Sequence, residues 1–543
     1  MRDCSVSTIV LGVLIAAGLP IALLGQTNVL TYKNNNSRTG GNITETVLTH
    51  TNVNAKLFGK LWFFTTDGWV DAQPLYVSGL TLPNLGTHNT LFVATENDTV
   101  YALDANTGSI LWQVSLLLPG ETASDNRGCG QITPIMGITA TPAIYLKSAS
   151  AGGYLYVVAM SKDSSGNYYQ RLHALSLGSG AERLGGPVTI QATYPGLGPN
   201  SLGGVLTFDP GAYKSRPALL VFNGVVYLSF SSNCDAPPFN GWIMAYSGNT
   251  LVQEAVLNTS PNGENGALWG SGGGPAVDSS GNLYQMVGNG TFDQTLNSLG
   301  FPTAGDYGNG FLKMNLAKNT LSITDYFASY NAADGPFDEN IELGSSSPLL
   351  LPSMKDASGT VRHLAVGAGK VGTIFVVDLD NMGKYNPAGD TNVYQALVGA
   401  LGPGGSQNAV GSNRFPPAFF GKTVYFSASQ TPIMAFQFTN ALLSATPVFS
   451  TTQTFQYPGA AMSVSANGTT NGILWAAAPG GDGVGNGLYA YVAGNLATEL
   501  YNSNQAANGR DQITYAKFAP PTIANGMVYV ATQTGVAAFG LLP

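Results

Sequence analysis

The sequence predicts an all-β protein that is assembled from one repeated unit of short strands. Only 10% of the 543 residues are charged, against roughly 25% in an average soluble domain. The chain holds 69 Gly and 30 Pro, yet 44% of it is hydrophobic and 10% aromatic. This composition is typical of many short strands joined by turns, and it is too apolar for a disordered chain. A recurring unit, without sustained helical periodicity, completes the prediction.

The repeated unit begins at a proline, often Pro-Ala, and continues through an Asn-Gly or Gly-X turn into an aromatic, β-branched strand. A second strand in the style of Tyr-Ala-Leu-Asp follows, then Thr-Gly and Leu-Trp. The clearest copy runs from Gln73 to Trp112. We count eight copies, which begin at Pro74, Pro142, Pro217, Pro275, Pro348, Pro417, Ser463 and Pro521. Their uneven spacing indicates loop insertions between units of one kind.

Each unit is a small four-stranded sheet that cannot bury both of its own faces. Radial packing around a central channel solves this problem and protects the strand edges. The sequence therefore predicts a β-propeller of eight blades, or of seven if one weak copy is an insertion. The last copy lacks a Leu-Trp outer strand, and residues 59–63 (Gly-Lys-Leu-Trp-Phe) match that strand. We expect the ring to close there, with 59–543 as one propeller domain and 26–58 as a lead-in segment.

The N-terminus has the pattern of an export signal. Arg2 precedes an apolar run from Ile9 to Leu24, which is short for a membrane span and ends at Gly25-Gln26. Residues 1–25 are predicted to be a signal peptide, with an uncleaved anchor as the alternative. The mature protein is then exported to the periplasm or the extracellular space, without a membrane span. Its two cysteines, Cys129 and Cys234, either form a disulfide or stay as buried thiols.

Several classes of chemistry are disfavoured by the sequence. The net charge is −8 and no basic run occurs, so nucleic acid is not an expected partner. The four histidines are not at zinc-ligand spacing. No Gly-x-Ser-x-Gly elbow, P-loop or dinucleotide fingerprint occurs.

The segment 100–108 (Val-Tyr-Ala-Leu-Asp-Ala-Asn-Thr-Gly), followed by Leu111-Trp112, resembles the pyrroloquinoline quinone (PQQ) repeat. In proteins with this repeat the Trp docks neighbouring blades. The resemblance covers about residues 28–540. It implies the propeller more strongly than any chemistry, because non-enzymatic scaffold propellers carry the repeat too.

Further segments resemble the cofactor site of quinoprotein alcohol dehydrogenases, in which PQQ and a Ca²⁺ ion lie in the central funnel. The segment 287–290 (Val-Gly-Asn-Gly) is similar to a family segment whose Asn is a calcium ligand. The resemblance implies that Asn289 and Asp235 bind the metal and that Asn289 also contacts the cofactor. Oxygen ligands of this kind suit a hard cation.

The resemblance also implies a catalytic base and a quinone-binding cation. Glu342 sits near the position of the family's catalytic Asp, and Asp338 is the alternative for that role. Lys370, in Gly-Lys-Val-Gly, resembles the Lys or Arg that contacts the quinone oxygens. Trp269 is the candidate for stacking on the cofactor.

Two features depart from that family. Its adjacent Cys-Cys pair is absent, and Cys129-Gly130 stands in that vicinity with one cysteine. The Trp expected just after the Gly-rich run is replaced by Pro275-Ala276, with Trp269 before the run instead. No Cys-x-x-Cys-His motif for a fused haem domain occurs.

These observations support an exported PQQ- and calcium-dependent dehydrogenase that oxidises a small alcohol or sugar. The alternative is a non-catalytic propeller, a scaffold or binding module for protein or polysaccharide on its loop face. A propeller hydrolase or lyase acting on sugars is a third possibility.

Overall fold

The computed structural model describes residue 1 and residues 27–334, 341–406, 409–479 and 486–543. All but the first residue of the expected signal peptide lie outside these ranges, as does Asp338. Four short 3₁₀ helices occur in the described part of the chain: η1 (Gly270–Gly272), η2 (Leu343–Ser345), η3 (Ser503–Gln505) and η4 (Ala507–Gly509). In those same ranges the structure contains no helix with the length and apolarity needed to cross a membrane.

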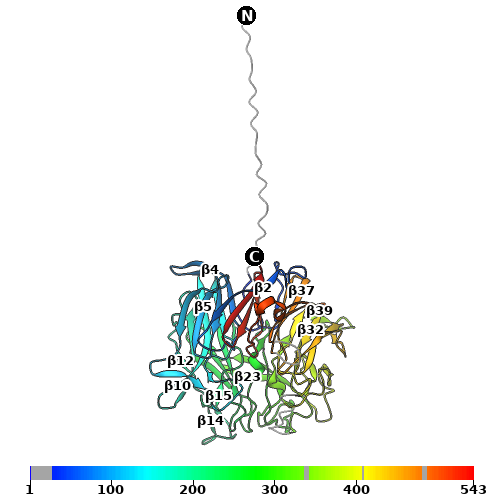
Figure 1. The fold of residues 1–543 in the computed structure, drawn as a ribbon. Coiled ribbons are helices and arrows are strands. Elements are labelled where there is room, and N and C mark those ends of the chain that lie inside the picture. Colours follow the sequence, from blue (N-terminus) through cyan, green and yellow to red (C-terminus); the bar gives the residue numbers. More distant parts are fainter. Residues whose placement is uncertain (2–26, 335–340, 407–408, 480–485) are drawn as a thin grey trace.

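The remaining regular structure is β-sheet, and eight sheets of four to six strands confirm the eight-bladed propeller. In Figure 1 the colours pass from cyan on the left through green to yellow on the right, and red returns beside blue. Each blade begins at its innermost strand, directly after or within a few residues of the start of one sequence repeat. The period of the repeat therefore sets the blade boundaries.

The first four blades share one order, from the inner strand outward. They consist of β3 (Leu75–Leu82), β4 (Gly86–Ala94), β5 (Thr99–Asp104) and β6 (Ile110–Ser115); β9 (Ala143–Ser148), β10 (Gly152–Asp163), β11 (Tyr168–Ser176) and β12 (Val188–Thr189); β16 (Leu220–Phe222), β17 (Val225–Ser232), β18 (Trp242–Ser247) and β19 (Gln253–Asn258); and β20 (Ala276–Val277), β21 (Leu283–Met286), β22 (Gly310–Ala317) and β23 (Thr320–Ala328).

The last four blades follow the same plan. They consist of β24 (Leu349–Leu350), β27 (Leu364–Ala368), β28 (Ile374–Asp378) and β30 (Gln395–Leu397); β31 (Ala418–Phe420), β32 (Thr423–Phe426) and β33 (Thr431–Thr439), with β34 (Leu442–Leu443) and β35 (Phe449–Phe455) both paired to β33; β36 (Ala461–Asn467), β37 (Thr470–Ala478), β38 (Gly487–Val492) and β39 (Asn495–Asn502); and β40 (Thr522–Ala524), β41 (Met527–Thr532), β42 (Gly535–Leu541) and β2 (Phe58–Thr65).

Short strands outside this plan belong to insertions. They are β1 (Gly41–Asn42), parallel to β36; β7 (Glu121–Asp125) and β8 (Ile135–Met136), added to the second blade; the hairpin β13 (Thr193–Pro195) with β14 (Val205–Thr207); β15 (Tyr213–Lys214), paired to β17; the hairpin β25 (Met354–Lys355) with β26 (Val361–Arg362); and β29 (Lys384–Tyr385), parallel to β23.

The expected ring closure is confirmed. The N-terminal strand β2 pairs antiparallel with the C-terminal strand β42, with Lys60 opposite Phe539 and Trp62 opposite Ala538. The eighth blade thus takes its three inner strands from the C-terminus and its outer strand from the N-terminus. Opening the ring requires separation of this pair, so both termini contribute to the stability of the whole domain.

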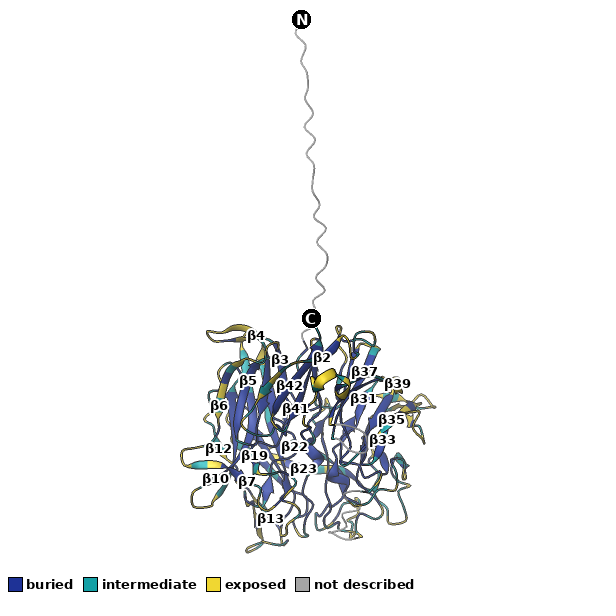
Figure 2. Cartoon of the chain, in the orientation of Figure 1, coloured by how far each residue is buried: buried dark blue, intermediate teal, exposed yellow. Residues whose placement is uncertain are grey.

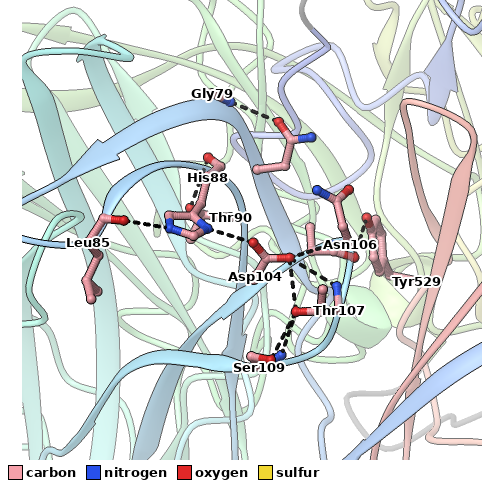
Figure 3. Close-up of polar contacts among 11 residues, drawn as sticks. Gly79, Leu85, His88, Thr90, Asp104, Asn106, Thr107, Ser109 and Tyr529 are labelled. Atoms are coloured by element: carbon pink, nitrogen blue, oxygen red, sulfur yellow. Dashed lines mark hydrogen bonds and ion pairs between the residues drawn. The ribbon is translucent and has the colours of Figure 1, made fainter.

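In the first blade, the Asp and Thr of the repeat (Asp104 and Thr107) stabilise the turn between β5 and β6 (Figure 3). Asp104 Oδ1 accepts hydrogen bonds from the amides of Asn106 (2.9 Å) and Thr107 (3.0 Å), while Oδ2 contacts Nδ1 of His88 at 2.6 Å. Tyr529 of the eighth blade donates to the carbonyl of Ala105 at 3.2 Å. The turn therefore also contacts the neighbouring blade.

The core lies between the blades, where facing sheets bury apolar side chains (Figure 2). One continuous cluster includes Tyr529 from the eighth blade, Val93 from the first and Val157 from the second. Exposed residues are concentrated in turns and outer strands. Each blade thus buries its faces against its two neighbours, as radial packing requires.

The lead-in segment lies inside the ring and contacts the inner strand of every blade. The bonded pairs are Val29 with Tyr76, Leu30 with Ile144, Asn36 with Val221 and with Val277, Ser37 with Leu350, Thr39 with Phe419, Gly40 with Val464 and Asn42 with Ile523. Backbone groups at the inner edges of the sheets, which an open channel would leave unpaired, are satisfied in this way. The segment therefore fills the channel between the inner strands.

Candidate functional site

A cavity of about 60 Å³ lies on the axis of the propeller and receives side chains from all eight blades. Most of its lining residues stand just before the inner strand of their blade. Asp71, Arg216, Ser345, Arg414 and Tyr457 all stand four residues before such a strand. The remaining lining residues are Gln131, Ile132, Asp235, Trp269, Ser271, Glu342, Lys370, Lys517 and Phe518.

The structure brings four of the residues expected from the sequence into this cavity: Asp235, Trp269, Glu342 and Lys370. Asn289 is buried but is not among the lining residues. Its neighbour Gly288 lies close by, since a Cβ at Gly288 would be 3.6 Å from Glu342 Oε1. Asp338 falls outside the described residues.

Glu342 and Lys370 form a buried ion pair. Glu342 directly precedes η2, and Lys370 lies in the turn between β27 and β28. Oε2 of Glu342 pairs with Nζ of Lys370, and both side chains are less than a tenth exposed. Burial raises the pKa of Glu342, while Lys370 opposes this shift and nearby Asp235 adds to it. The pair places a carboxyl group of raised pKa beside a cation.

Asp235 and Trp269 form a second contact on the wall of the cavity. Asp235 follows β17 in a tight turn at φ 51°, and its Oδ1 accepts from Ser232 Oγ at 2.6 Å. Trp269 Nε1 donates to the same oxygen at 3.3 Å. The indole is thus held in one orientation by a carboxylate that itself is fixed by its turn.

The cysteines form a disulfide, which settles the alternative that the sequence left open. Cys129 and Cys234 are bonded, with Cα atoms 5.5 Å apart. Each is close in sequence to a lining residue, Cys129 to Gln131 and Cys234 to Asp235. The bond therefore ties the β7–β8 insertion to the β17–β18 loop at the edge of the cavity.

Lys214 lies against both the disulfide and the indole. Its Nζ is 3.7 Å from Cys129 Sγ and 4.4 Å from the centre of the Trp269 ring. Burial lowers the pKa of Lys214 to about 7, with the cation Arg216 adding to this effect. An amine therefore lies between the sulfur of Cys129 and the face of the Trp269 indole.

The cavity is also lined by cations that the sequence analysis did not predict. Arg216 donates to the carbonyls of Thr139 and Lys517, lies 3.9 Å from Asp71 and stacks on Phe518. Such fixed guanidinium groups bind carboxylates with defined geometry.

Two more cations lie over the same aromatic ring. The guanidinium of Arg414 is 5.0 Å and the ammonium of Lys517 is 5.9 Å from the ring centre of Tyr457. Lys517 makes no ion pair among the residues that the structure describes. Arg216 and Arg414 each stand four residues before an inner strand, and this shared position within the repeat is the signal that could have found them.

A buried acid lies behind Asp71. Burial raises the pKa values of both Asp71 and Glu96, and Glu96 is further raised by the charge of Asp71. Arg216 opposes the shift in both groups. The wall at this side can therefore hold a proton next to the cavity.

The donor set fits an anion with carboxylate groups. Arg216, Lys370, Arg414 and Lys517 all line the cavity, and PQQ is a flat tricarboxylate quinone whose charges such groups neutralise. Trp269 and Phe518 add aromatic surface to the same wall.

The fit to calcium is weaker. Calcium takes about six to eight oxygen ligands, but Lys370 engages Glu342 and Asn289 lies off the cavity surface. Within the described ranges no group of three His, Cys, Asp or Glu side chains could hold a metal. A calcium role for Asp235 and Asn289 therefore stays a prediction.

Similarity to known proteins agrees with this architecture. A family model described as outer membrane protein assembly factor BamB matches residues 60–136. The chain is a propeller of PQQ-type repeats. No curated protein matches its sequence.

Two solved structures share the fold over 95% of this chain and 80% of their own length, each at 14% sequence identity. They are the quinohemoprotein alcohol dehydrogenase of Comamonas testosteroni, with a TM-score of 0.60, and quinohemoprotein alcohol dehydrogenase ADHIIG of Pseudomonas putida HK5, with a TM-score of 0.58. At this identity the likeness establishes the fold and leaves the chemistry to the site.

Proposed function

We propose that this propeller binds a PQQ-type quinone in its axial cavity and oxidises a small alcohol or sugar. The observation that carries the proposal is the convergence of four cations with Glu342 and Trp269 in one cavity on the axis. Cations from separate blades suit a ligand that carries several carboxylates, because each can be met from its own direction.

The cations have different roles in this proposal. Arg216, Arg414 and Lys517 neutralise the carboxylates and set the orientation of the ring system. Lys370 stands beside Glu342, so it is placed to polarise a quinone carbonyl next to the reacting centre. The quinone, when bound, supplies the hydride acceptor.

Glu342 is the proposed base, with Asp338 as the alternative outside the described residues. Its carboxylate accepts the hydroxyl proton of the substrate as the carbon–hydrogen bond breaks. Because burial raises its pKa, the active carboxylate forms only above the ordinary range for Glu. The rate is therefore expected to rise with pH through that raised pKa.

Calcium is the second proposed ligand, with Asp235 and Asn289 as its side-chain ligands. Oxygen donors of this type suit the ion. Removal of calcium with a chelator tests this role separately, because the cations on the wall can hold an anionic ring without it.

Turnover with a matched pair of variants tests the dehydrogenase. Purified protein is loaded with PQQ and calcium and assayed on a panel of alcohols and sugars with an artificial electron acceptor. Glu342→Gln should lose about 10²-fold or more in rate, as expected for loss of a general base. Glu254→Gln, on the outer strand β19, should keep the wild-type rate. A loaded wild-type protein that oxidises no member of the panel contradicts the proposal.

A second candidate function is a non-catalytic role in which the propeller binds a protein partner. The observation that favours it is the match of residues 60–136 to a model of an outer membrane assembly factor. Crosslinking to one defined envelope protein, lost when loops around the cavity mouth are changed and unaffected by PQQ, would favour this role over the enzyme.

We also propose export to the periplasm or the extracellular space. A disulfide such as Cys129–Cys234 is typical of oxidising compartments. N-terminal sequencing of the protein from its native host tests this, with a mature start near Gln26 expected. A chain that retains Met1 in the cytoplasm would contradict export.

A further inference from the structure

A second hollow lies at the other end of the blades, and nothing above uses it. It spans about 730 Å³ and is bounded by the lead-in segment, β9 and the turns β16–β17 and β18–β19. Asn223 precedes β17 and Asp235 follows it, so the eight-residue strand, about 26 Å long, separates this hollow from the axial cavity. We call it the lower groove.

The lower groove carries no formal charge. Its lining includes no Asp, Glu, Lys, Arg or His, and its only ionisable groups are the phenols of Tyr145 and Tyr156. This contrasts with the axial cavity, where seven charged side chains meet. The groove therefore does not select a ligand by charge.

Amide side chains from three separate elements line the groove. Asn34 and Asn36 come from the lead-in segment, Asn223 from the β16–β17 turn and Asn249 from the β18–β19 turn. An amide offers both donors and acceptors without charge. Such groups match adjacent sugar hydroxyls, each of which also donates and accepts.

Part of this hydrogen-bonding capacity is unused. Oδ1 of Asn34 is buried and has no hydrogen-bond partner among the described residues. Asn223 and Asn249 are exposed. A buried acceptor without a partner is costly unless a ligand or water satisfies it. The groove thus presents polar groups that a polyhydroxylated ligand can satisfy.

Aromatic surface accompanies the amides. Tyr145 is 41% exposed although it belongs to the inner strand β9, and Phe222 also lines the groove. Tyr156 is fixed by a 2.5 Å hydrogen bond to the carbonyl of Gly248. Exposed rings beside amides bind the apolar C–H faces of sugar rings while the amides bind the hydroxyls.

We infer that the lower groove is a binding site for a neutral oligosaccharide. Its volume of about 730 Å³ lies in the upper part of the range that is usual for ligand sites, which favours more than one sugar ring over a monosaccharide. The inference does not depend on the proposed quinone, because the two sites share no lining residue.

The test uses calorimetric titration of the full-length mature protein with cellohexaose, xylohexaose, mannohexaose and maltohexaose. A galacturonic acid hexamer serves as the charged counterpart. We expect at least one neutral hexasaccharide to bind, with Asn249→Ala and Tyr145→Ala each weakening the affinity about tenfold or more. Asn106→Ala is the matched control, because Asn106 occupies the corresponding turn of the first blade outside the groove.

Three results would overturn the inference: no neutral hexasaccharide binds, the two groove variants bind as well as the wild type, or the galacturonic acid hexamer binds as tightly as the best neutral ligand. Circular dichroism checks that each variant is folded. Lys517→Gln in the axial cavity should leave saccharide binding unchanged, which separates this site from the quinone site.

Discussion

The indole of Trp112 packs directly on Gly180 of the next blade. A Cβ at Gly180 would lie 2.7 Å from Cε3 of that ring, and the indole Nε1 donates to the carbonyl of Leu177 at 2.9 Å. Trp62 covers Gly108 in the same way, with a corresponding distance of 2.8 Å. The Trp and the Gly of the repeat thus form one contact between successive blades, and each needs the other.

Gly180→Ala tests this contact. The new methyl group would overlap the Trp112 ring, and Gly180 also has φ +68°. We expect the free energy of unfolding to fall by about 2–3 kcal/mol, measured by urea denaturation. Gly166→Ala is the control, because Gly166 has φ +87° and open space where its Cβ would lie. Equal losses in both variants would show that backbone strain alone, and not blade docking, governs this position.

Asp98 gives a test of buried charge. It is fully buried, and burial raises its pKa well above the ordinary value. In the unfolded chain this carboxyl ionises near pH 4. Between that pH and the raised pKa of the folded protein, folding therefore requires Asp98 to take up a proton. The stabilising contribution of Asp98 is complete below pH 4 and is lost as pH rises toward the raised pKa.

Asp98→Asn removes this dependence on pH. Relative to wild type, the variant should gain unfolding free energy as pH rises above 4, by up to about 1.4 kcal/mol for each pH unit, until the pH reaches the raised pKa. Denaturation at pH 5, 6, 7 and 8 measures the difference. A constant difference across these four values would mean that Asp98 is ionised in the folded protein.

Arg38 tests the lead-in segment as a structural plug. It is fully buried and donates to the carbonyls of Tyr32, Pro275 and Leu219, which join the segment to two blades. Arg38→Met leaves these buried acceptors without their donor, so we expect a loss of about 3 kcal/mol in unfolding free energy. Arg183→Met, at an exposed site, should change stability little. Two variants of equal stability would mean that the plug adds nothing to the ring.

The disulfide supplies a test at the cavity edge. Cys129 and Cys234 are 105 positions apart in the sequence, and loss of such a bond is expected to cost about 2–5 kcal/mol. The double variant Cys129→Ser, Cys234→Ser should therefore unfold at lower urea concentration than the wild type. Stability that is unchanged in this variant and in reduced wild-type protein would contradict a structural role.

The sequence predicted the blades because each repeat carries its own local signals. Pro74 and its seven counterparts mark the inner strands, and the missing outer strand of the last copy predicted closure by residues 59–63. These features depend on local turns and strand patterns, which a single sequence displays. Eight blades and the expected closure are confirmed.

Only part of the site could be predicted from the sequence. Resemblance pointed to Asp235, Trp269, Glu342 and Lys370, which do line one cavity. Arg414 and Lys517 were missed because their importance comes from convergence on the axis, which depends on the ring and not on neighbours in sequence. Arg216 and Lys517 show how far apart in sequence such partners lie, since Arg216 Nη2 donates to the carbonyl of Lys517.

Equilibrium binding of PQQ to the mature protein tests the central claim most directly. PQQ is titrated into the wild type and into Lys517→Gln, once in the presence of calcium and once in the presence of a chelator. Binding is followed by the absorbance of the quinone. We predict one saturable site per chain, with an affinity about tenfold weaker in the variant. Retention of binding in the chelator would assign the charge neutralisation to the wall cations. Absence of saturable binding in both conditions would contradict the quinone site, and the axial cavity would then serve another ligand.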